Sequence, residues 1–118
     1  MNLTQMLQVS PHLSVMASGK KVRLYVHPHG KGSFADVTAP IAALLGKTLT
    51  PKGDLLLDGW STNHYRRLVQ DVNAAAQTNL RCHFCCALVG PVIPFSDWDT
   101  PIRQKIEAEW TARWKGAK

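Results

Sequence analysis

The segment from Lys21 to His27 constrains the fold most, because apolar and polar residues alternate strictly along it. Its apolar positions are Val22, Leu24 and Val26. Its polar positions are Lys21, Arg23, Tyr25 and His27. Successive side chains of a strand point to opposite faces, so this pattern predicts a half-buried strand with an outward polar face. The preceding Ser18-Gly19 favours a hairpin turn to a first strand that contains Leu13-Ser-Val-Met16.

Helical patterns supply elements that could cover the apolar face of this hairpin. The strongest begins after Ser61 or Thr62 and places one apolar stripe at the spacing of a helix. The stripe consists of Tyr65, Leu68, Val69, Val72 and Ala76. A shorter helix is predicted with Thr38 as its cap and Gly46 after its end. A final helix is predicted with Asp99 or Thr100 as the cap and Pro101 in its first position.

The remaining segments add strands and one ambiguous element. Leu55–Leu57 is typical of a short apolar strand, and Leu80–Val89 is apolar on both faces apart from Arg81 and His83, which predicts a central strand. Leu3–Val9 is compatible with a short helix or a strand. We therefore predict an α+β domain over residues 1–118, with one mainly antiparallel sheet of about four strands and two to three helices packed on it. A mixed α/β sandwich is the alternative.

Length and composition exclude several classes of protein. A chain of 118 residues suits a single domain, and no run approaches the roughly 18 apolar residues of a membrane span. The first residues lack the charged and apolar regions of a signal peptide. Cys82, Cys85 and Cys86 are an odd number of cysteines within one short segment, so they predict reduced core thiols and a cytoplasmic location.

The charge is positive and unevenly distributed. The chain has 14 Lys and Arg against 8 Asp and Glu, a formal charge of +6. Residues 1–70 hold eight basic and three acidic side chains, a net charge of +5. This balance favours an anionic partner for the first part of the chain.

The candidate contacts to nucleic acid or another anion follow from this charge and from the alternating strand. They are Lys21, Arg23, Tyr25, Lys31, Arg66 and Arg67. The cations would pair with phosphates, and Tyr25 would stack on a base. Lys31 lies in Gly30-Lys-Gly-Ser33, which lacks the spacing of a P-loop but could accept a backbone phosphate. An ordinary solvated strand face and loop are the alternatives.

Metal and thiol chemistry have weaker candidates. His27 and His29 lie two residues apart at a strand end, and His64 or a cysteine would have to complete a metal site. Cys82 and Cys85 have CxxC spacing, but no second pair accompanies them, and core packing explains them as well. No acid–base pair or nucleophile motif is present, so we assign no catalytic residue and expect no cofactor or bound metal.

The final helix carries a second kind of candidate surface. Trp110 and Trp114 lie one turn apart on it, and packing onto the sheet would explain both. If Trp114 is exposed beside Arg113, this pair would instead form a partner surface. The sequence is compatible with either arrangement.

These observations lead to three functional hypotheses. The first is a small non-enzymatic protein of phage or mobile-element type that binds nucleic acid or a complex containing nucleic acid. The second is a protein–protein inhibitor or adaptor, such as an anti-defence protein of the anti-CRISPR kind, acting on an acidic or nucleic-acid-bound partner. The third is a small metal- or thiol-dependent enzyme. We expect no membrane partner, and a homodimer is compatible with each hypothesis.

Overall fold

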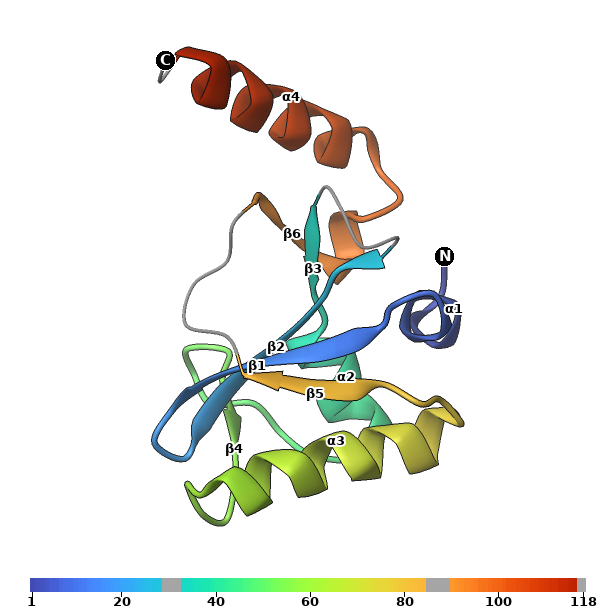
Figure 1. The fold of residues 1–118 in the computed structure, drawn as a ribbon, viewed down its shortest axis with the longest axis vertical. Coiled ribbons are helices and arrows are strands. Elements are labelled where there is room, and N and C mark those ends of the chain that lie inside the picture. Colours follow the sequence, from blue (N-terminus) through green and yellow to red (C-terminus); the bar gives the residue numbers. More distant parts are fainter. Residues whose placement is uncertain (29–32, 85–89, 117–118) are drawn as a thin grey trace.

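The computed structural model describes residues 1–28, 33–84 and 90–116 and shows an α+β fold (Figure 1). It measures 43 × 27 × 26 Å. The helices are α1 (Leu3–Gln8), α2 (Thr38–Leu44), α3 (Thr62–Ala76) and α4 (Pro101–Gly116), with a short 3-10 helix η2 (Phe95–Asp97). The strands are β1 (His12–Ser18), β2 (Lys21–Val26), β3 (Phe34–Asp36), β4 (Leu55–Leu56), β5 (Arg81–Phe84) and β6 (Val92–Pro94).

The six strands form one mixed sheet in the order β5-β1-β2-β3-β6, with β4 also paired to β2. The pairs of β2 with β1, β3 and β4 are antiparallel. The pairs β1–β5 and β3–β6 are parallel, and in each case the connecting chain contains α2 and α3. The α+β class is confirmed, and the sheet has more strands and a more mixed character than the sequence predicted.

The predicted hairpin and the predicted α3 stripe form the core together. Ser18 pairs with Lys21 across the turn, and Gly19 has a φ of +62°, a left-handed conformation that favours glycine. The inward side chains of β2 are fully buried. Helix α3 buries the predicted stripe apart from Tyr65, which is half-buried, and Figure 1 shows α2 and α3 along one side of the sheet.

Two predictions about the elements are wrong. The strand predicted over Leu80–Val89 is not central, because its described part, β5, lies at the edge of the described sheet. Phe84 is 44% exposed, and residues 85–89 lie outside the described part of the chain. Thr38 is not the cap of α2 either, since Val37 occupies that position and the Thr38 hydroxyl contacts β2 instead.

Helix α4 lies apart from the sheet in Figure 1, and side chains in its first half contact the rest of the chain. Trp98 precedes it and is only 3% exposed, and the Arg103 guanidinium lies 4.2 Å from the centre of its ring. Ile106 packs partly against the core, whereas Ile102 is 49% exposed. Among the described residues, no helix is long and apolar enough to cross a bilayer.

Candidate nucleic-acid interface

Residues 57–65 meet the turn of the β1–β2 hairpin, although the two segments are distant in sequence. The Tyr65 hydroxyl on α3 shares its single proton between the carbonyl of Gly19, at 2.7 Å, and the carbonyl of Trp60, at 3.1 Å. The backbone N–H of Leu57 donates to the carbonyl of Lys20 at 2.8 Å. These bonds hold Lys20 and Trp60 beside the first turn of α3.

A cavity of about 360 Å³, here called the Trp60 pocket, opens at this junction. It is lined by Lys20, Asp58, Gly59, Trp60, Ser61 and His64. Trp60 is 71% exposed, although an indole is usually buried to a large extent in a folded protein. A smaller cavity of about 70 Å³ shares Asp58 and His64 with the pocket and adds Arg67 and Lys47 to its lining.

The His64 ring is held between two neighbours in the chain. Its Nδ1 lies 2.7 Å from the Ser61 hydroxyl and accepts a hydrogen bond from the Ser61 backbone N–H at 3.4 Å. The ring also lies directly over Gly59, where an added Cβ would stand 2.3 Å from it. Only glycine permits this approach, so Gly59 and Ser61 fix the position of His64 in the pocket wall.

The basic side chains around the pocket are exposed. Lys20, Lys47 and Arg67 face two carboxylates, Asp58 and Asp71, across the two cavities. Within the described part of the chain, none of these five side chains belongs to an ion pair. The three cations can therefore contact an external anion without first breaking an internal pair.

The predicted cations lie on different sides of this region. Arg67 lines the smaller cavity, and Lys21 is exposed beside Lys20 at the start of β2. Arg66 is also exposed, but it lies close enough to β5 for its charge to act on Cys82 there. Burial raises the pKa of the half-buried Cys82 thiol on β5, and the positive charge of Arg66 partly offsets that increase.

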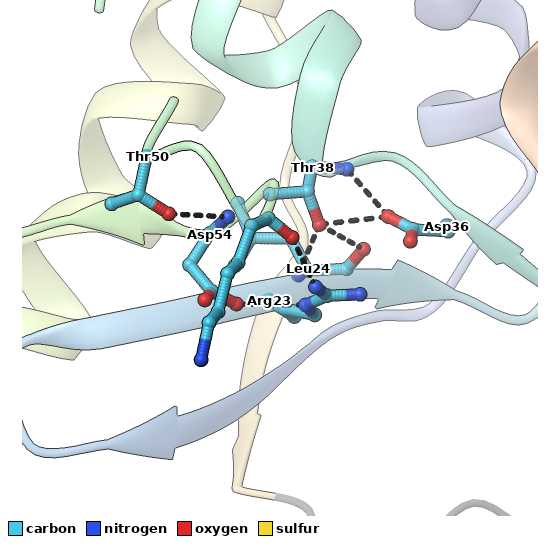
Figure 2. Close-up of polar contacts among 7 residues, drawn as sticks. Arg23, Leu24, Asp36, Thr38, Thr50 and Asp54 are labelled. Atoms are coloured by element: carbon cyan, nitrogen blue, oxygen red, sulfur yellow. Dashed lines mark hydrogen bonds and ion pairs between the residues drawn. The ribbon is translucent and has the colours of Figure 1, made fainter. Parts of the chain in front are cut away.

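Arg23 does not extend the interface, because it stabilises a turn of the same chain (Figure 2). Its Nε donates to Asp54 at 2.7 Å and its Nη2 donates to the carbonyl of Lys52 at 2.6 Å. The hydrogen bond with Asp54 is the main reason that the pKa of Arg23 is raised. Its guanidinium therefore ties β2 to the turn that precedes β4.

Tyr25 does not face solvent as the alternating pattern predicted. It is 7% exposed, which leaves no open ring face for a base, and burial raises the pKa of its phenol. The predicted outward polar face of β2 is therefore wrong at this position. Alternation shows which residues share a face, but it does not show whether other segments cover that face.

Thr38 contacts β2 at Leu24, between the part of β2 that pairs with β4 and the part that pairs with β3. Its hydroxyl accepts a hydrogen bond from the Leu24 backbone N–H at 2.9 Å and donates one to Asp36 at 2.7 Å (Figure 2). A cavity of about 310 Å³, here called the Thr38 cavity, is bordered by Arg23, Asp36 and Thr38 together with Pro94 and Phe95. Arg23, Asp36 and Thr38 at this cavity are already hydrogen-bonded within the protein.

The metal candidates are not brought together among the residues that the structure describes. There, no three His, Cys, Asp or Glu side chains are placed to hold a metal ion. The His27 ring stacks on Phe34 at 4.4 Å, and its Nε2 is buried without a hydrogen-bond partner in the described part of the chain. His64 lies in the Trp60 pocket instead. The candidates outside the described residues are His29, Lys31, Cys85 and Cys86.

The predicted partner surface on α4 is seen in part. Arg113 is exposed near the end of the helix, and the side chain of Trp114 lies outside the described part of the structure. The exposed Ile102 lies at the opposite end of the same helix.

Sequence patterns alone did not identify Asp58, Trp60 and Ser61 as members of a site. The available signal was the segment Asp58-Gly-Trp-Ser61, in which a tryptophan lies in a turn outside any apolar stripe. Neither helical nor strand periodicity predicts that such a tryptophan is buried. No family model, curated protein or solved structure matches this chain.

Proposed function

We propose that this protein binds nucleic acid through the hairpin turn and the N-terminal half of α3. The contacts are made by Lys20 and Lys21 of the hairpin and by Arg67 of the helix, all of which are exposed. The observation that carries the proposal is the pair of hydrogen bonds from Tyr65 to Gly19 and Trp60, because it joins the cations of the hairpin to those of the helix.

Electrostatics supports this assignment. Exposed Lys and Arg side chains that pair with phosphates release counterions from the nucleic acid, so binding weakens as salt rises. Lysine and arginine side chains on a helix and an adjacent turn can contact successive phosphates of a nucleic acid without distinguishing its base sequence. The net charge of +5 in residues 1–70 supplies the long-range attraction.

The test measures affinity for fluorescently labelled single- and double-stranded oligonucleotides between about 50 and 200 mM salt. We expect log K to fall linearly with log salt, and Lys20→Ala and Arg67→Ala each to reduce the steepness of that slope by about 1. Lys105→Ala is the matched control, because it removes one exposed positive charge from α4. The proposal fails if no oligonucleotide binds at low salt, or if binding does not change with salt.

A second candidate, a protein adaptor, is favoured by α4. The helix extends away from the sheet with Ile102 and Arg113 exposed, which suits a partner surface. The test is a pull-down from nuclease-treated lysate with the native chain and with Ile102→Asp. One protein partner that the native chain retains and the variant loses would support an adaptor, and loss of all partners on nuclease treatment would contradict it.

A further inference from the structure

We infer that the Trp60 pocket takes an unpaired nucleobase, so that the protein prefers single-stranded over double-stranded nucleic acid. This inference rests on the proposed function and specifies its ligand. It places a base against the indole of Trp60 and the adjoining phosphate beside Lys20.

The first argument is the exposure of Trp60 together with the fixation of its backbone. Its carbonyl accepts a hydrogen bond from Tyr65, and the preceding Gly59 lies under the His64 ring. The side chain therefore projects from a firmly held turn. An exposed aromatic ring on a rigid support loses little conformational entropy when a base stacks on it, and every base has a ring face to offer.

The second argument is the size and shape of the pocket. Its volume of about 360 Å³ falls within the range of roughly 300–1,000 Å³ that is typical of small-ligand sites. A base within a duplex is already stacked on its neighbours and paired, so it cannot enter without being extruded. A single strand can turn one base outward at much lower cost.

The third argument is the placement of charge around the pocket. Lys20 and Asp58 both belong to the lining, and Arg67 lines the cavity that adjoins it. A phosphate is attracted to the cations and repelled by the Asp58 carboxylate. The backbone of the strand is therefore expected to run along Lys20 and Arg67, with the base directed to Trp60.

The experiment compares Trp60→Ala and Trp60→Phe with the native protein on matched single- and double-stranded oligonucleotides. Base stacking on an aromatic side chain predicts that Trp60→Ala weakens single-strand binding roughly 5- to 150-fold. Double-strand binding and the salt dependence should change little, because the cations remain. Trp60→Phe should retain most of the single-strand affinity. Circular dichroism checks that each variant is folded.

The outcomes separate this inference from the proposed function. Absence of binding to any oligonucleotide at low salt overturns both. Salt-dependent binding with equal affinity for single and double strands, or with an equal loss on both in Trp60→Ala, overturns the pocket and leaves the proposed function standing. Selective loss of single-strand binding, restored by phenylalanine, supports the pocket.

Discussion

Two cavities of similar volume differ in how their polar groups are used. The Thr38 cavity measures about 310 Å³, and Arg23, Asp36 and Thr38 at its border are all hydrogen-bonded within the protein. The Trp60 pocket measures about 360 Å³ and presents Lys20 and an exposed indole to solvent. The first arrangement stabilises the fold, whereas the second leaves a cation and an aromatic ring available to bind a ligand.

This difference shows why basic residues that are close in sequence are not equivalent. Lys20 and Arg23 lie on the same hairpin, yet only Arg23 has a carboxylate partner in the described structure. A cation that is already paired must break its internal bond before it can bind a phosphate. Substitutions at the Thr38 cavity should therefore affect stability alone, whereas substitutions at the Trp60 pocket should affect binding.

Thr38→Val is expected to have the largest effect on stability. It keeps the shape of the side chain but leaves the buried Leu24 backbone N–H without its acceptor, which costs about 1–3 kcal/mol. Urea denaturation measures the loss, and Thr38→Ser, which keeps the hydroxyl, should lose much less. Oligonucleotide affinity of the folded variant should be unchanged. A loss in Thr38→Ser as large as the loss in Thr38→Val would contradict a dominant role for the hydrogen bond, because serine keeps the hydroxyl and lacks only the methyl group.

Gly59→Ala should lower stability and binding together. The new methyl group would overlap the His64 ring and force it away from Ser61, at a cost of about 1–2 kcal/mol. In a His64→Ala background the same substitution should cost almost nothing, and a double-mutant cycle measured by denaturation checks this coupling. Additive losses would contradict the close contact between the two residues.

Arg23→Gln should produce a smaller loss of stability. Its side chain is partly exposed, so solvent screening limits the value of the Asp54 pair to about 0.5–1 kcal/mol. Oligonucleotide affinity and its salt dependence should stay the same.

Lys20→Ala should show the reverse pattern, with a stability change within about 0.5 kcal/mol and a reduced salt slope. A reduced salt slope in Arg23→Gln would remove the distinction between the two cavities.

The smallest effect concerns Tyr25 at alkaline pH. Burial raises the pKa of its phenol above the ordinary value of 10.0, so the unfolded chain loses this proton before the folded chain does. The stabilisation is complete below pH 10.0 and is lost as pH rises through the folded pKa. Native protein should therefore lose more stability than Tyr25→Phe as the pH rises above 10.0, measured by urea denaturation. Identical pH profiles would contradict burial of the phenol.

The elements that sequence patterns predicted well are those with strong periodicity. The α3 stripe and the inward face of β2 are buried as expected, because both patterns are long enough to define one apolar face. The run Leu80–Val89 misled because its apolar residues lacked such a pattern, and β5 lies at the sheet edge. Thr38 has the composition of a helix cap, but a backbone N–H of β2 competes for its hydroxyl.

Local sequence was sufficient for the hairpin, for the main helices and for the excess of positive charge, because these depend on neighbouring residues. The tertiary structure decided which cations stay available. Arg23 meets Asp54 and the Lys52 carbonyl only when β2 and the turn before β4 come together. Lys20 lies near Trp60 only when the bonds of Tyr65 and of the Leu57 N–H join the hairpin turn to residues 57–65. Such long-range pairings leave no periodic signal in the chain, since each depends on how separate elements pack.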